Sequence, residues 1–186
     1  SFEHSAERRM VLSGHLLGSS HLRALLPSLT ALTGRMHVPP GWTLDGLVIG
    51  AEGGHKVVSE QVDRLLGANV SLVGLWIQDW SGMVSTRNGE MVWWNWELDE
   101  VRYPRWWMRE IVNKGIKLLT YINPMLAAAP SSDGRPPSVF LEAKRLDHLL
   151  KDTAGEPIVM WNPLNGIPYG QVDLLRNETW NWWVQL

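Results

Sequence analysis

The chain has 186 residues, a formal net charge of −2 at pH 7 and a charged fraction of 19%. This length suffices for one domain with a sizeable core, and the balanced charge argues against nucleic acid or an anionic membrane surface as a partner. The lack of cysteine excludes disulfide frameworks and zinc–thiolate sites, and no apolar run is long enough to span a bilayer. The unusual feature is the presence of 12 tryptophans, of which we expect about half to lie in the core.

Residues 1–40 are expected to form a segment that leads into the main domain. Within it, His21–Thr33 has the composition and apolar spacing of a helix, and Pro27 is where this helix would break. The chain starts with Ser1 rather than Met and stops inside an expected helix. We therefore expect it to be an excerpt of a longer protein.

Residues 41–186 begin with a regular alternation of expected strands and helices. The segments Leu44–Ile49, Val70–Ile77 and Ile116–Ile122 are expected strands, and Val70–Ile77 is a nearly continuous apolar run, as expected of a parallel strand that is covered on both faces. Amphipathic helices are expected between them, from His55 to Leu66 and from Pro104 to Gly115; the second would bury Trp107, Met108, Ile111 and Val112. Strand and helix alternating at this spacing predict right-handed βαβ units and a parallel sheet, the α/β class.

The remaining segments are less regular. A hairpin is expected around Asn88-Gly89, a preferred tight-turn dipeptide, and it would carry Trp93, Trp94 and Trp96. Beyond the third strand we expect a loop over residues 127–137 and a helix over residues 139–150. A small β excursion is expected around residues 158–161, and a final helix from residue 177 onward.

Polar or aromatic residues follow all three expected strands. Glu52 comes after the first strand, Gln78, Asp79 and Trp80 after the second, and Asn123 after the third. Ligands of parallel α/β sheets bind beyond the carboxyl ends of the strands, so these side chains are expected to converge on one face. Amides and carboxylates hydrogen-bond hydroxyl groups and indoles cover sugar rings, which favours a carbohydrate site at the mouth of a barrel. For Asp79 and Asn123 taken singly, a capping or loop role remains the alternative.

A phosphate site is the second interpretation of the first strand end. Gly50, Gly53 and Gly54 lie between a strand and a helix, where backbone N–H groups can hold an anion. However, the dinucleotide fingerprint and the Walker lysine are both absent, and Glu52 would repel a phosphate. The six histidines show no paired metal spacing and no serine lies in a nucleophile-elbow motif, so no metal or cofactor is expected.

Several consecutive blocks resemble glycoside hydrolase family 31. The blocks are L-T-G-R-M-H-V-P-P-G-W-T-L-D-G-L-V-I-G-A-E-G-G, G-L-W-I-Q-D-W-S-G, W-W-N-W-E-L-D, Y-P-R-W, K-G-I-K-L-L-T-Y-I-N-P and V-D-L-L-R-N-E-T-W. The match covers roughly residues 32–183, and the order and spacing of the blocks make the resemblance specific. Within the family, Q-D-W-S-G and W-N-W are most similar to the sulfoquinovosidase branch.

The resemblance implies a partial (β/α)₈ TIM barrel: about the first three β/α units, with a Trp-rich hairpin insertion and a small β excursion. It also implies a retaining α-glycosidase that uses two neighbouring carboxyl groups, one as the nucleophile and one as the acid. In the family the nucleophilic Asp ends the fourth strand and the acid follows later, so both are expected outside this chain. No catalytic residue is therefore assigned within it, and neither Asp79 nor Asp173 is put in that role.

The resemblance also assigns part of the sugar pocket. It implies that Gln78 binds hydroxyls of the sugar that is cleaved, that Glu52 contacts the same sugar, and that Trp94 helps to hold a sulfonate. Met91 departs from the pattern, because it stands where sulfoquinovosidases have the arginine that pairs with the sulfonate. A buried sulfonate without a charged partner is costly, and Arg87, across the turn, is placed off the Met91 position.

Two functions follow. The first is a retaining α-glycosidase acting on α-glucosides or sulfoquinovosides, with this chain supplying part of the substrate pocket. The alternative is a catalytically inactive barrel that binds carbohydrate. In both, the partner is a carbohydrate, with no nucleic acid and no membrane. A partial barrel leaves unpaired strand edges, so we expect the excerpt alone to be inactive and to aggregate or remain molten.

Overall fold

The computed structural model describes residues 14–163 and 166–186, and it divides into the units Ser1–Pro40 and Gly41–Leu186. The only regular element described in the first unit is helix α1, Leu22–Thr33, which buries none of its residues. The helix predicted here is confirmed, but it continues through Pro27 instead of breaking there.

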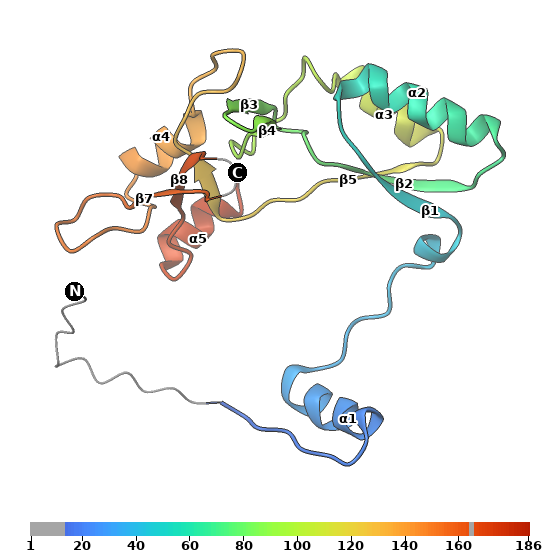
Figure 1. Ribbon diagram of the computed structural model, residues 1–186, viewed down its shortest axis with the longest axis horizontal. Helices are drawn as coiled ribbons and strands as arrows, with labels where there is room; N and C mark the ends of the chain where they lie inside the picture. Colours follow the sequence, from blue (N-terminus) through green and yellow to red (C-terminus); the bar gives the residue numbers. More distant parts are fainter. Residues whose placement is uncertain (1–13, 164–165) are drawn as a thin grey trace. The chain divides into compact units, whose positions relative to one another are not determined.

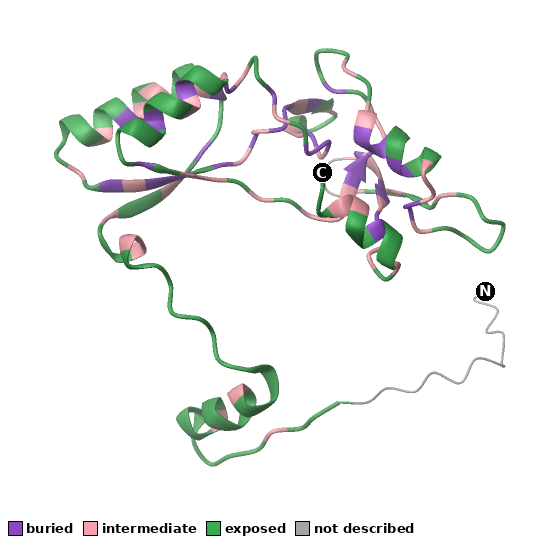
Figure 2. Ribbon diagram, turned by 180° about the vertical axis from the view of Figure 1, so that it is seen from behind, coloured by how far each residue is buried: buried purple, intermediate pink, exposed green. Residues whose placement is uncertain are grey.

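The second unit is built on a parallel sheet in the order β1-β2-β5, formed by Leu47–Ala51, Leu72–Ile77 and Lys117–Leu119 (Figure 1). Helices α2, Gly54–Gly67, and α3, Arg105–Asn113, connect the strands and pack against the sheet. The predicted βαβ arrangement and the α/β class are therefore confirmed. The buried core is purple in Figure 2 and contains Ala51, Val58, Val62, Leu72, Leu75, Ile77, Tyr103, Trp107, Ile111 and Ile116.

The opposite face of this sheet, the open face, carries Val48, Gly50, Gly74, Trp76, Lys117 and Leu119. The register places these six on one side, because Val48 pairs with Gly74, Gly74 with Lys117, Gly50 with Trp76, and Trp76 with Leu119. Val48 and Trp76 remain 43% and 42% exposed. Strands β1 and β5 each pair only with β2 among the described residues, so each also has a free edge. A largely apolar face and two free edges are what a segment of an unclosed barrel presents.

The ends of the predicted strands needed correction. The first strand begins at Leu47 rather than Leu44, because Gly41–Leu44 forms a 3-10 turn and Gly46 runs close to Ser71; a Cβ on Gly46 would lie 2.4 Å from the Ser71 carbonyl oxygen. The third strand ends at Leu119 rather than Ile122. In α3, Trp107 and Ile111 are buried as predicted, whereas Val112 is on the solvent side.

The hairpin consists of β3, Met83–Thr86, and β4, Gly89–Val92. Thr86 pairs with Gly89, so Arg87 and Asn88 occupy the turn and only Gly89, at φ 101°, takes the left-handed conformation. The prediction of a hairpin is confirmed, but the three tryptophans follow β4 instead of lying on the strands.

The last part of the unit is a second sheet flanked by two helices. Its strands β6, Met125–Ala127, β8, Pro168–Gln171, and β7, Val159–Trp161, are antiparallel in that order. Helix α4 spans Ser138–Arg145, shorter than predicted because Asp147 takes a left-handed φ of 64°, and α5 spans Asn177–Trp183. The predicted β excursion is thus the edge strand of a three-stranded sheet, whose first strand begins at Met125, two residues before the expected loop.

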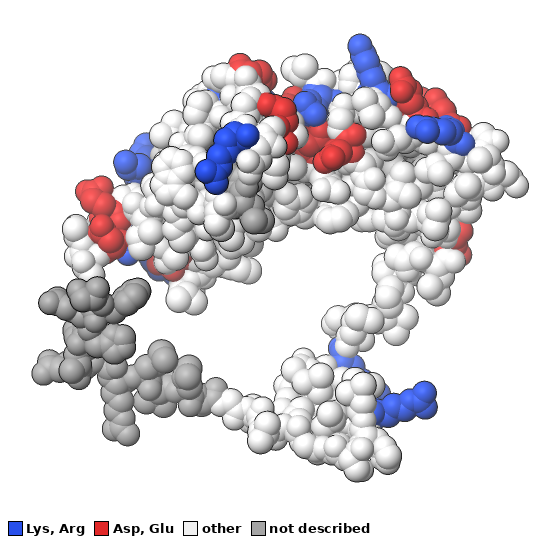
Figure 3. Space-filling view, viewed as in Figure 1, with Lys and Arg blue, Asp and Glu red and all other residues white. Residues whose placement is uncertain are grey.

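No helix in the described part of the chain has both the length and the apolarity needed to cross a bilayer. On the side of the Gly41–Leu186 unit seen in Figure 3, acidic and basic side chains lie beside one another instead of forming a field of one sign.

The open face and the free edges predict the behaviour of the chain alone. Expressed as residues 41–186, it should associate or remain molten, because Val48, Trp76 and two strand edges stay in contact with water. Size-exclusion chromatography with light scattering and a thermal melt provide the measurement, with the full-length protein as the control. A monomer that melts cooperatively would contradict this prediction.

Candidate functional site

Asp79 is a fully buried carboxylate directly after β2, and every one of its close partners lies in another loop. Oδ2 accepts hydrogen bonds from the Gly53 N–H at 3.0 Å and from Nε and Nη2 of Arg102 at 3.0 and 2.6 Å. Oδ1 accepts the Tyr103 hydroxyl. Asp79 therefore links the loop after β1, the end of β2 and the segment that leads into α3.

Tyr103 extends this network to the start of α2. Burial, followed by the hydrogen bond to Asp79, raises the pKa of the Tyr103 hydroxyl above its usual range, so the group stays protonated and remains a donor. Its oxygen in turn accepts the N–H of Gly54 at 3.1 Å. The carboxylate, the phenol and the guanidinium of Arg102 therefore act as one unit.

The same contacts argue against the alternative phosphate site. The N–H of Gly53 is bonded to Asp79, the N–H of Gly54 to Tyr103, and the N–H of His55 to the Arg102 carbonyl at 2.8 Å. These are the N–H groups at the beginning of α2 that a bound phosphate would need. They already have protein partners.

Gln78 lies beside the Asp79 network but belongs to the other face of the sheet. Its backbone N–H donates to the Ala51 carbonyl at 3.1 Å, and its side-chain amide reaches across β1, because a Cβ on Gly50 would lie 3.2 Å from Nε2. Side chains alternate along a strand, so Gln78 shares the side of Trp76. The Glu52 side chain is exposed at the neighbouring end of β1. Glu52 and Gln78 thus occupy adjacent strand ends.

Aromatic rings surround Tyr121, which lies just after β5. Its ring makes edge contacts with Trp76 and Trp96, with centroids 6.1 and 5.5 Å apart. Trp80 stacks on Trp96 at 6.0 Å and donates its indole N–H to the Tyr121 carbonyl at 3.0 Å. Burial raises the pKa of the Tyr121 hydroxyl, while a hydrogen bond with Trp94 acts in the opposite direction. Tyr121 therefore joins the open face to the tryptophans that follow the hairpin.

Trp94 and Met91 lie on the hairpin side of this aromatic group. Trp94 is half-buried and makes an edge contact with Tyr169, with centroids 5.6 Å apart. Met91 is also half-buried, and with Trp94 it packs against an apolar cluster that includes Val84 and Ile167. Met91 therefore packs against apolar side chains.

Asn123 makes a local hydrogen bond just after the third strand. It lies four residues beyond the end of β5, and its Oδ1 accepts the N–H of Met125 at 2.9 Å, which fixes the start of β6. Within residues 14–163 and 166–186, no hydrogen bond joins Asn123 to Glu52 or Gln78. The structure thus brings together Glu52 with Gln78, and Trp80 and Trp94 around Tyr121.

Sequence reasoning did not single out Trp76, Trp96 and Tyr121 as site residues, or Arg102 as the partner of Asp79. A signal for Trp76 existed, because it precedes Gln78 by two positions and must share its side of a strand. No sequence pattern indicates that Arg102 reaches back to a residue 23 positions earlier.

The fold and the site define a class of protein: an α/β segment with a parallel sheet whose helix-free face carries the Trp76 ring and the Gln78 amide. The model of the glycosyl hydrolases family 31 TIM-barrel domain matches residues 36–186. The sulfoquinovosidase of Escherichia coli (strain K12) is 34% identical over 170 residues, and that of Agrobacterium fabrum is 31% identical over 163 residues. These alignments cover 88% and 87% of the chain but 23% of each relative.

Solved structures agree with this family. A family 31 sulfoquinovosidase from E. rectale, in complex with an aza-sugar inhibitor, superposes with a TM-score of 0.74 at 31% identity, covering 86% of this chain and 23% of the other. A Flavobacterium johnsoniae family 31 dextranase complexed with glucose shares the fold, with a TM-score of 0.66 at 20% identity over 89% of this chain and 19% of the other. The chain belongs to glycoside hydrolase family 31 and carries part of its TIM-barrel domain.

The Asp79 network makes a stability prediction. Asp79→Ala should lower the free energy of unfolding by about 3–5 kcal/mol, because it leaves Arg102, Tyr103 and the Gly53 N–H without their shared partner. Urea unfolding of the full-length protein, followed by tryptophan fluorescence, measures the change.

Glu100→Ala is the matched control. The Glu100–Arg105 ion pair spans 2.8 Å, but its side chains are 55% and 66% exposed, so its loss should cost less than about 1 kcal/mol. Equal shifts for the two variants would contradict the role of Asp79.

Proposed function

We propose that this chain forms the first part of the catalytic barrel of a retaining α-glycosidase, which hydrolyses O-glycosyl bonds of α-glycosides. In this proposal residues 1–40 lead into the barrel and residues 41–186 supply its first strands. The strands that close the barrel would pair with the free edges of β1 and β5 and cover Val48 and Trp76. The family membership and the shape of the sheet support this proposal.

The observation that carries the proposal is the position of the Gln78 amide. It lies on the helix-free side of the sheet, over Gly50 and two residues from Trp76, where the interior of a closed barrel would be. An amide can donate to one sugar hydroxyl and accept from another. We assign to Gln78 the hydroxyls of the sugar that is cleaved, and to Glu52 a contact with the same sugar.

The other predicted residues take complementary roles in this proposal. Trp94 would cover a face of the sugar, and Trp80, stacked on Trp96, would form a wall of the pocket. Asp79 and Asn123 would act as positioning residues, because their oxygens are bonded to neighbouring loops.

The catalytic carboxyl groups are assigned to none of the residues of this chain. A retaining glycosidase needs two carboxyl groups about 5 Å apart that can reach the anomeric carbon and the leaving oxygen. Two buried carboxylates, Asp79 and Asp99, are each held by an arginine, at 2.6 Å from Arg102 and 2.7 Å from Arg135. Neither is available as a nucleophile or an acid.

Met91 bears on which α-glycoside is cut. The two curated relatives are sulfoquinovosidases, and a sulfonate next to Trp94 would need a cation to replace its water shell. Met91 and its apolar neighbours supply none. We therefore place α-glucosides ahead of sulfoquinovosides as substrates.

Steady-state kinetics of the full-length protein on nitrophenyl α-glucoside and nitrophenyl α-sulfoquinovoside test the proposal. We expect turnover, with a higher kcat/KM for the glucoside. Gln78→Ala should lower kcat/KM by about tenfold or more, because it removes hydrogen bonds to the sugar.

Gln185→Ala, which changes an exposed glutamine after α5, should leave kcat/KM unchanged. Sugar binding without turnover of either substrate would favour the inactive carbohydrate-binding barrel. An unaltered kcat/KM in Gln78→Ala would remove Gln78 from the sugar site.

A further inference from the structure

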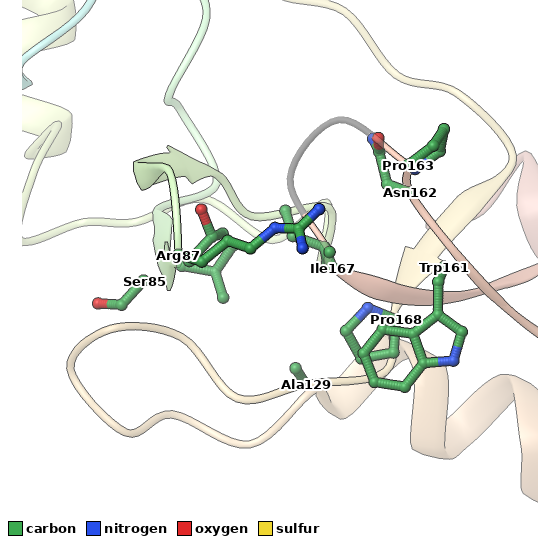
Figure 4. Close-up of a pocket in the computed structure, with 11 residues that line it drawn as sticks. Ser85, Arg87, Ala129, Trp161, Asn162, Pro163, Ile167 and Pro168 are labelled. Atoms are coloured by element: carbon green, nitrogen blue, oxygen red, sulfur yellow. The ribbon is translucent and has the colours of Figure 1, made fainter.

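A cavity of about 550 Å³ lies between the β3–β4 hairpin and the β7–β8 strands (Figure 4). We call it the Arg87 pocket; its lining includes Ser85, Thr86, Arg87, Trp161, Asn162 and Pro168. Its volume is in the range of pockets that hold small ligands. None of the six residues predicted for the sugar site lines it.

Arg87 gives this pocket its charge. Figure 4 shows its side chain extending from the hairpin turn toward Ile167 on the opposite wall. No carboxylate is among the residues that line the cavity, and the described part of the chain offers Arg87 no ion-pair partner. A guanidinium in this position keeps its fork of N–H donors for the oxygens of an acid group.

Trp161 provides the second feature of the pocket. Its side chain is 67% exposed, although it is the largest apolar group of β7, and it lies next to Pro168 in the cavity wall. An exposed indole beside a cavity is a surface on which the apolar face of a sugar ring can stack. A cation and an indole therefore line one cavity.

The walls of the pocket are held by backbone pairing. Trp161 pairs with Pro168, and the Pro168 carbonyl also accepts the N–H of Ala128 at 2.8 Å. Across the cavity, Val84 of β3 and Ile167 belong to the same buried cluster. The distance between the two walls is therefore set before a ligand binds, which lowers the entropy lost on binding.

We propose that the Arg87 pocket is a second carbohydrate site, which binds a saccharide carrying an acid group. Arg87 would bind the carboxylate or the phosphate ester of such a sugar, and Trp161 would cover its ring. The two acid groups share one chemistry, an oxyanion next to a hydroxylated ring. This site is independent of hydrolysis and goes beyond the proposed α-glycosidase activity.

Direct binding to the full-length protein tests this proposal. Ligand-observed NMR titrations with glucuronate, glucose 6-phosphate and glucose at low ionic strength compare the two acid groups with a neutral sugar. At least one of the acids should bind about tenfold or more tightly than glucose when both are titrated against the Gln78→Ala variant, which weakens the competing sugar site, and added salt should weaken binding of the acid. The acid that binds more tightly identifies the group that is recognised.

Four variants locate the site of binding. Arg87→Ala should weaken the binding of the acid about tenfold or more. Arg87→Lys should weaken it by less, because lysine keeps the positive charge but lacks the paired N–H donors of the guanidinium. Trp161→Ala, which removes the stacking surface, should weaken it about fivefold. Arg109→Ala, which removes an exposed arginine of α3, is the matched control and should have no effect. Substitution of the exposed Arg87 should leave the fold intact.

Gln78→Ala separates this proposal from the sugar site, because it should leave binding of the acid unchanged. Equal binding of glucose and both acids would overturn the proposal, as would equal effects of Arg87→Ala and Arg109→Ala. A loss of acid binding in Gln78→Ala alone would assign the acid to the sugar site and would also overturn it.

Discussion

The buried carboxylate of Asp79 is the interaction on which the rest of the structure depends. It fixes the loop that begins α2 through Gly53, and the segment that begins α3 through Arg102 and Tyr103. Both helices are thereby held on the side of the sheet toward which Asp79 points. Because side chains alternate along the chain, Gln78 turns to the other side. One carboxylate thus positions the helices and, indirectly, the Gln78 amide on the helix-free face of the sheet.

Much of the fold was predictable because the central parallel strand is a nearly continuous apolar run, the pattern expected of a strand that is covered on both faces. The strand Leu72–Ile77 and the helix Gly54–Gly67 were predicted to within a few residues. The errors arose where tertiary contacts override local pattern. Gly46 passes so close to Ser71 that the first strand starts late, and the antiparallel pairing of β6 with β8 joins residues too distant in sequence for any local signal.

The site was predictable in its polar residues but not in their partners. The rule that ligands lie beyond strand ends selected Gln78 and Glu52, which do lie at adjacent strand ends. The same rule selected Asp79, but its oxygens are bonded to Arg102 and Tyr103. The rule could not exclude Asp79, because a sequence does not reveal which carboxylate will pair with an arginine elsewhere in the chain. The aromatic contacts of Tyr121 depend likewise on where the chain turns after β5, which no periodicity specifies.

The central claim is that the open face of the sheet is the interior of a glycosidase barrel and that Gln78 contacts the sugar there. Its most direct test is a crystal structure of the full-length protein with a non-hydrolysable α-glycoside. The account predicts sugar hydroxyls within about 3.2 Å of the Gln78 amide, with Val48 and Trp76 enclosed by further strands. A helix packed on that face, or a sugar bound away from Gln78, would contradict it.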